Sequence, residues 1–155
     1  METKTKVNAL EGKQDLVITR TFDLPVDLLF KAYTEAELVE QWMGTKMLKL
    51  ESRKHGSYQQ ETTNPQGTVI FRANGVIHEL IPNKKITRTF EMENTPFGVQ
   101  LEVYEFHALE ENTSKLDMHV IYESTELRDQ VLKLPFAQGI NMAHNRIEEI
   151  LSKLK

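Results

Sequence analysis

The sequence has 155 residues, enough for one domain with a substantial core. Apolar residues make up 39% of it and charged residues 27%, which is typical of a folded globular protein. The formal net charge is −4 and Lys and Arg form no long run, so nucleic acid and anionic membranes are not expected as partners. The chain has no cysteine, which excludes disulfides, thiolate nucleophiles and iron–sulfur sites.

Residues 1–13 are polar and contain Gly12, and they predict a flexible N-terminal arm ahead of a single domain over residues 14–155. The opening residues lack the apolar stretch of a signal peptide, and no window approaches the roughly 18 apolar residues of a membrane span. The sequence therefore predicts a cytoplasmic protein, either a monomer or a homodimer.

The first predicted elements are one strand and two short helices. Residues 14–22 are rich in β-branched side chains, which indicates a strand. Pro25 stands at the first turn of a short helix, where a missing N–H costs least. Thr34 followed three residues later by Glu37 is a capping-box pattern, so we expect Thr34 to be the N-cap of a second helix that Gly44 ends.

Six further segments are separated by turn-forming residues, which predicts an antiparallel meander. They are residues 47–53, 57–63, 68–80, 85–93, 99–109 and 113–122. Asn74-Gly75 lies inside the longest segment. Because the extended pattern continues on both sides of it, we expect a bend or a bulge there in place of a hairpin turn.

The clearest pattern is at the C-terminus, where apolar residues recur at steps of three and four and predict a long amphipathic helix. These residues are Phe136, Ile140, Ala143, Ile147, Ile150, Leu151 and Leu154. Ser124 or Thr125 can cap the start of the final helical region, and Pro135 either separates two helices or kinks one. One long helix needs an apolar surface to lie on. The sequence therefore predicts an α+β fold in which a curved seven-stranded antiparallel sheet surrounds the C-terminal helix.

A curved sheet around one helix often encloses a cavity, and alternation along the strands indicates which side chains face it. It places Arg88 and Glu102 on the inner face. Because an unpaired charge in an apolar cavity is costly, we expect the two to pair with each other, with water or with a ligand. Either Arg88 binds a ligand carboxylate or carbonyl while Glu102 orients it, or the two form a structural ion pair at the cavity rim.

Aromatic and other apolar side chains complete the predicted wall, although an ordinary core explains each of them as well. The remaining candidates are Trp42, Tyr58, Phe71, Phe90, Tyr104, Phe106, Met118, Phe136 and Ile140. Trp42 is the expected gate because it ends a helix beside a glycine. The hydroxyls of Tyr58 and Tyr104 either contact a ligand or bond to the backbone.

The sequence contains no motif for metal binding or nucleophilic catalysis. His107 and His119 are expected on neighbouring strands, on the outer face of the sheet. The adjacent His78 and Glu79 are the one pair suited to acid–base chemistry, but alternation places them on opposite faces unless a bulge turns His78 inward. We therefore expect no metal and no cofactor.

Several local motifs occur in a characteristic order. They are FDLP at 22–25, LVEQW at 38–42, GVIHELIP at 75–82, ITRTFE at 86–91, PFG at 96–98 and ELRD at 126–129. Together with the order of elements, they resemble the START-like superfamily, also called SRPBCC or helix-grip. Within it, the chain is most similar to the group around the activator of the heat-shock-protein-90 ATPase. The resemblance covers roughly residues 15 to 152.

The resemblance implies a ligand site between the concave face of the sheet and the long helix. It leaves three functions open, because members of the superfamily include lipid and polyketide binders, enzymes and co-chaperone domains. The leading hypothesis is a non-catalytic binding protein for a small hydrophobic molecule. The alternatives are a co-chaperone-like module that stimulates a chaperone ATPase, and a cyclase or hydrolase that uses the same cavity.

Overall fold

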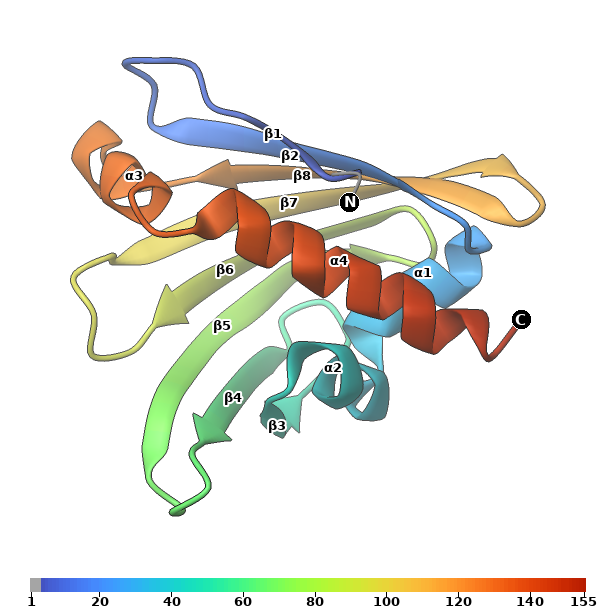
Figure 1. The fold of residues 1–155 in the computed structure, drawn as a ribbon, viewed down its shortest axis with the longest axis horizontal. Helices are drawn as coiled ribbons and strands as arrows, with labels where there is room; N and C mark the ends of the chain where they lie inside the picture. The colour runs from blue at the N-terminus through green and yellow to red at the C-terminus, as the bar shows by residue number, and fades with distance from the viewer. Residues whose placement is uncertain (1–3) are drawn as a thin grey trace.

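The computed structural model describes residues 4–155; the first three residues of the predicted arm lie outside the described residues. The fold is α+β, with one antiparallel sheet of eight strands and four helices in the described part of the chain (Figure 1). The strands lie in the order β1-β2-β8-β7-β6-β5-β4-β3. No helix within residues 4–155 is both long enough and apolar enough to cross a membrane.

The predicted meander is confirmed to within a few residues at each strand end. The strands are β1 (Lys6–Asn8), β2 (Asp15–Phe22), β3 (Lys46–Leu50), β4 (Ser57–Thr63), β5 (Val69–Ile81), β6 (Lys85–Met92), β7 (Val99–Glu110) and β8 (Thr113–Ile121). The helices are α1 (Val26–Thr34), α2 (Ala36–Met43), α3 (Thr125–Leu132) and α4 (Phe136–Ser152).

The prediction of seven strands was one strand short. Residues 6–8, which we expected in a flexible arm, form β1 and pair antiparallel with β2, so that Val7 lies opposite Ile18. The backbone N–H of Thr5 also donates a hydrogen bond of 3.1 Å to Asn141 Oδ1 of α4. Pairing with β2 and contact with α4 therefore order a segment that has no strand pattern of its own.

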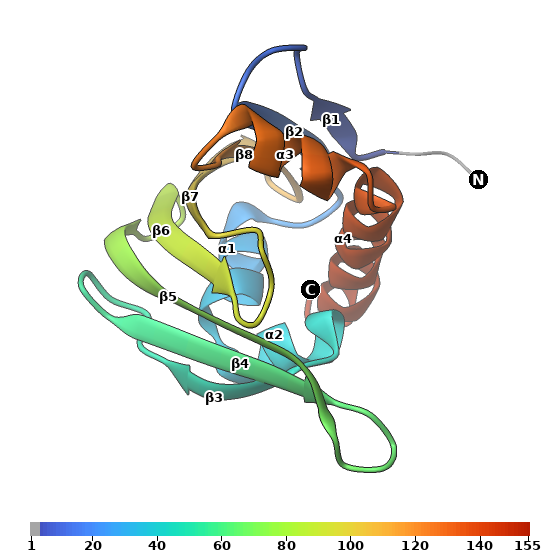
Figure 2. The same cartoon turned by 90° about the vertical axis from the view of Figure 1, so that its left-hand side faces the viewer.

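The two short helices lie inside the curve of the sheet, and α4 closes its open side (Figure 2). Helix α1 begins directly after Pro25, as predicted. The capping-box prediction was wrong, because Thr34 is the last residue of α1 and its hydroxyl donates to the carbonyl oxygen of Phe30 at 3.1 Å. Gly44 ends α2 in the left-handed conformation, with φ of 67°, which confirms the predicted stop.

Strand β5 continues through Asn74-Gly75, which confirms the expectation of one long strand, but its register shift with β6 lies farther along, between Ile77 and Glu79. Gly75 lies opposite Tyr58 of β4, and the Tyr58 hydroxyl donates a 2.6 Å hydrogen bond to the carbonyl oxygen of Thr89 in β6. A β-carbon on residue 75 would collide with that carbonyl oxygen and lie 2.6 Å from the Tyr58 ring. Glycine is required here because the tyrosine ring crosses directly over the strand.

Pro135 separates two helices, which resolves the alternative left open by the sequence. Ser124 caps α3 by accepting a hydrogen bond from Leu127 N at 3.2 Å. The C-terminal half of α4 packs into the core through Ile147 and Leu151, both completely buried. The helix ends at Ser152, so Leu154 lies beyond it and is exposed.

The polar flank of α4 is attached to β2. Arg20 of β2 is 1% exposed, and its Nη1 donates to Asn145 Oδ1 at 2.7 Å while Nη2 lies 3.4 Å from Glu148 Oε1. Burial lowers the pKa of Arg20, and Glu148 counteracts this by favouring the charged form. These contacts fix α4 along one side, so that its apolar stripe faces the sheet.

Candidate functional site

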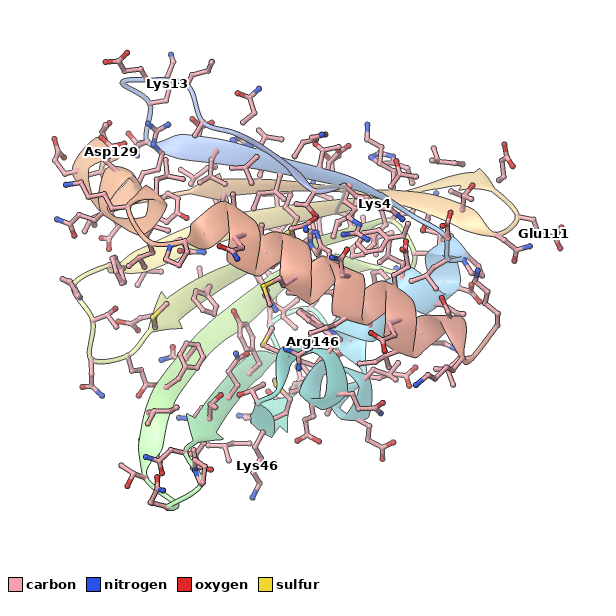
Figure 3. The ribbon with its side chains drawn as sticks, viewed as in Figure 1. Lys4, Lys13, Lys46, Glu111, Asp129 and Arg146 are labelled. Atoms are coloured by element: carbon pink, nitrogen blue, oxygen red, sulfur yellow. The ribbon has the colours of Figure 1, made fainter. Side chains whose placement is uncertain are left out.

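A cavity of about 420 Å³ lies between the concave face of the sheet and α4. Its lining comes from strands β2, β6, β7 and β8, from the N-terminal half of α4, and from residues of α1, α2 and α3. The volume falls within the range typical of small-molecule sites. Charged residues labelled in Figure 3, such as Lys13, Lys46 and Glu111, lie at the periphery of the molecule.

Most of the predicted site residues are brought together in this wall. Those that line the cavity are Trp42, Arg88, Phe90, Glu102, Tyr104, Met118, Phe136 and Ile140. Trp42 is 5% exposed, and its indole N–H donates to the carbonyl oxygen of Ala32 in α1 at 2.7 Å. The hydrogen bond and burial hold Trp42 in the wall of the cavity.

Three predicted site residues do not line the cavity. Tyr58 lies behind Arg88, with its ring centroid 4.8 Å from the guanidinium carbon, and its hydroxyl bonds to the backbone. Phe106 lies farther along β7, where it packs edge-on against Phe30 of α1 at 5.1 Å. Phe71 is half-buried near the turn between β4 and β5. Alternation places Phe106 on the inner face but does not indicate that α1 fills the space above it.

The cavity also has lining residues that were absent from the predicted set. They are Ile18, Tyr33, Met43, Met92, Phe97, Gly98, Gln100, Val120, Tyr122, Val131, Leu134, Pro135, Gly139, Ala143 and His144. Val120 and Tyr122 follow from alternation with Met118 in β8, and Ala143 from the helical stripe. Phe97 and Leu134 lie in connections between elements, where the sequence carries no periodic signal.

The polar centre of the cavity is a hydrogen-bonded cluster on two neighbouring strands. Arg88 lies opposite Glu102 in the register of β6 and β7, and its Nε donates to Glu102 Oε1 at 2.8 Å. Arg88 Nη2 donates to the Tyr104 hydroxyl at 2.9 Å, and that hydroxyl donates to Glu102 Oε1 at 3.0 Å. Gln100 Nε2 donates to Glu102 Oε2 at 2.7 Å. The sequence-based pairing of Arg88 with Glu102 is therefore present.

The surroundings also fix the protonation states of Tyr104 and Arg88. Burial raises the pKa of Tyr104 well above its ordinary value, so its hydroxyl stays neutral. Burial acts to lower the pKa of Arg88, but Tyr104, Tyr58 and Glu102 outweigh it and raise that pKa well above the usual range. The guanidinium is therefore a permanent cation at the cavity wall.

Two buried polar atoms of lining residues have no hydrogen-bond partner among residues 4–155: the Tyr122 hydroxyl and His144 Nε2. The other ring nitrogen of His144, Nδ1, lies 2.8 Å from the Thr5 hydroxyl. Burial, assisted by Arg20, lowers the pKa of His144 to about 3, so the ring is neutral at physiological pH. Burying a polar group without a partner is costly, so these two atoms are an unsatisfied part of the wall.

The remaining histidines are outside the cavity. A bulge between Ile77 and Glu79 is present in β5, but His78 is exposed and does not line the cavity. His119 lies 2.7 Å from Asp15 on the outer face, and this contact lowers the pKa of the Asp15 carboxyl. Within residues 4–155, no group of histidines and carboxylates is arranged to hold a metal ion.

Comparison with solved structures shows the same fold in bacterial proteins. A Rhodobacter sphaeroides protein superposes with a TM-score of 0.85 at 21% identity, over 96% of this chain and 99% of that chain. A Mycobacterium smegmatis protein gives a TM-score of 0.82 at 22% identity, over 95% and 96%. An Arthrobacter aurescens protein gives 0.84 at 18% identity, over 97% and 93%. At these identities the likeness establishes the fold alone.

No functionally curated protein matches the sequence. Residues 23–152 match the family described as "Activator of Hsp90 ATPase homolog 1-like protein". The match begins just before α1 and includes every element that lines the cavity except β2. The chain therefore belongs to the family of proteins like the Activator of Hsp90 ATPase homolog 1, within the START-like superfamily.

Proposed function

We propose that this protein binds a small, largely apolar molecule in the cavity between the sheet and α4. The observation that supports the proposal most directly is the unfilled space of about 420 Å³ beside a closely packed core. The side chains that line this space are mostly apolar, and contact between apolar surface and water is unfavourable. An apolar guest that covers this surface therefore gains free energy on binding.

The lining supports an apolar guest held without catalysis. Aromatic and aliphatic side chains such as Phe90, Phe97 and Phe136 form most of the wall. Arg88 and Glu102 are held in an ion pair, and the exposed His78 is unsuited to attack a molecule in the cavity. The proposed role is to hold, carry or sense the molecule.

Gly139 offers a sharp test, because it lines the cavity and a β-carbon there would meet nothing within 4 Å. The wild-type protein should bind the uncharged dye N-phenyl-1-naphthylamine, followed by the rise in dye fluorescence. Gly139→Leu should weaken this binding at least about tenfold, because the leucine side chain occupies the space. Ala137→Leu is the matched control, since Ala137 is an exposed residue of the same helix outside the lining.

Equal dye binding by wild type and Gly139→Leu would contradict the cavity as the binding site. Native mass spectrometry of protein purified from its own cell supplies the second test. The proposal predicts that a small molecule co-purifies with the wild-type protein and that this molecule is lost from the Gly139→Leu variant.

The family match supports a second candidate function. Because the family is described by likeness to an activator of the Hsp90 ATPase, the chain is also a candidate module that binds and stimulates a chaperone ATPase. ATP turnover by an Hsp90-type chaperone should then rise when the protein is added. Unchanged turnover, together with no complex on size-exclusion chromatography, would exclude this function. The elution volume of the protein without the chaperone distinguishes a monomer from a homodimer.

A further inference from the structure

We propose that the cavity selects an uncharged ligand that carries a hydrogen-bond acceptor, such as a ketone carbonyl, and rejects a carboxylate of the same shape. The inference rests on the proposed binding function and names the chemical class of the ligand. It is carried by the way in which Arg88 and Glu102 are bonded.

Arg88 has donors to spare. A guanidinium carries five N–H groups, of which one bonds to Glu102 and one to Tyr104, leaving three without a partner in residues 4–155. The Arg88 side chain is only 14% exposed and it lines the cavity. An oxygen acceptor on a ligand would satisfy an N–H that has lost contact with most of its water.

Glu102 already supplies the negative charge that Arg88 needs. Its side chain is 7% exposed, and its two oxygens accept hydrogen bonds from Arg88, Tyr104 and Gln100. The cluster is thus neutral in sum. A ligand carboxylate would lose its hydration, share one cation with Glu102 and face a like charge at close range. A carbonyl gains the same hydrogen bond without that repulsion.

Rearrangement of Arg88 toward an anion is opposed by its surroundings. The rings of Tyr58 and Tyr104 have their centroids 4.8 and 5.0 Å from the guanidinium carbon, and both cation–π contacts stabilise the present position of the group. Separation from Glu102 would also leave a buried carboxylate without its cation, which is strongly unfavourable. The ion pair therefore stays closed when a ligand enters.

The other polar atoms of the lining fit the same class. The Tyr122 hydroxyl and His144 Nε2 lack partners in the described chain, and both groups are uncharged. Both atoms are buried, so these two lining residues add no cation that would attract an anion. The lining as a whole therefore offers donors without net positive charge.

A matched ligand pair tests the selection. 2-Acetylnaphthalene and 2-naphthoate have nearly the same shape and differ in charge at the polar end. Isothermal titration calorimetry at pH 7.5 should show that the ketone binds to wild type at least about tenfold more tightly, equivalent to about 1.4 kcal/mol. Glu102→Gln gives the cluster a net positive charge and should reverse the preference. Glu105→Gln, an exposed carboxylate of the same strand, should leave it unchanged.

The possible outcomes separate the two proposals. Binding of 2-naphthoate as tight as that of the ketone, or an unchanged preference in Glu102→Gln, overturns the selection and leaves cavity binding intact. Binding of N-phenyl-1-naphthylamine but not of the ketone also overturns it. Failure of all three compounds overturns both proposals. If Glu102→Gln does not fold, the double variant R88M/E102M removes both charges. Wild type should bind the ketone more tightly than 2-ethylnaphthalene, which lacks the carbonyl, and the double variant should bind the two equally.

Discussion

Gly75 and Gly139 should respond to alanine in opposite directions, although each lies inside a regular element. Gly139 is in α4, where an added β-carbon contacts nothing, and alanine is favoured over glycine in a helix by roughly 0.8–1.0 kcal/mol. Gly139→Ala should therefore stabilise the protein by about 1 kcal/mol.

Gly75→Ala should destabilise the protein by about 3 kcal/mol. Overpacking of a tight site costs roughly 1–3 kcal/mol, and here the upper end applies because the obstructing Thr89 oxygen belongs to the backbone and cannot rotate away. The Tyr58 ring must also shift, which weakens the 2.6 Å hydrogen bond from its hydroxyl to the carbonyl oxygen of Thr89. Such a hydrogen bond contributes about 1 kcal/mol to stability.

Urea denaturation of wild type and both variants measures these effects, and thermal melting gives a second readout. At roughly 2–4 °C per kcal/mol for a chain of this size, Gly75→Ala should lower Tm by about 6–12 °C and Gly139→Ala should raise it by about 2–4 °C. The packing argument is refuted if Gly75→Ala stays within about 0.5 kcal/mol of wild type, or if the two variants shift stability in the same direction.

Three further variants test the polar contacts. Arg20→Met should lower the free energy of unfolding by about 2 kcal/mol, because Asn145 and Glu148 lose their hydrogen bonds to a charged group. A loss below about 0.5 kcal/mol in urea would contradict this. Burial lowers the pKa of His144 to about 3, whereas an unfolded histidine titrates near 6.5. Between these values only the unfolded state takes up the proton, so stability should fall by about 1.4 kcal/mol per pH unit as the pH drops below about 6.5. His144→Asn should show a shallower pH dependence, and parallel curves for the two proteins would refute the assignment. Ser124→Ala removes the cap of α3 and should cost about 1 kcal/mol, measured as a shift of the urea midpoint.

The sequence predicted the sheet well because its turns and alternation are local features. Strand β4 was predicted with its observed bounds, and β5 was correctly kept whole across Gly75. Arg88 and Glu102 were placed together because alternation puts each on the inner face and neighbouring strands align them. The pairing of these two side chains is therefore encoded in short segments of the chain.

Features that depend on distant contacts escaped prediction. Strand β1 contains one apolar residue, Val7, so its sequence carries no strand pattern. It forms because it pairs with the edge of β2 and because Asn141 of α4 accepts a hydrogen bond from the backbone of Thr5. Thr34 matched a capping box, but its hydroxyl bonds to Phe30 within the preceding helix, so α1 continues to that residue. The local pattern identifies a hydroxyl that could cap a helix. Whether the hydroxyl does so depends on which backbone groups lie within its reach in the folded protein.

The extent of the site escaped prediction for a similar reason. Phe106 satisfies the alternation rule, yet α1 packs over it through Phe30, and this packing ends the cavity. His144 reads as an isolated polar residue in a helical sequence, and only its contact with Thr5 and its burial show that it belongs to the cavity wall. Which part of a concave face stays open depends on the helices that lie against it.

The open sheet of this protein has two borders that are poorly suited to joining another molecule. One border is β1, whose three residues are too few to template an added strand. The other is β3, where a register shift between Met47 and Lys49 and exposed lysines at positions 46 and 49 interrupt a flat hydrogen-bonding surface. Short, kinked and charged borders oppose strand addition between chains. The fold can thus keep a wide sheet without promoting fibrous aggregation.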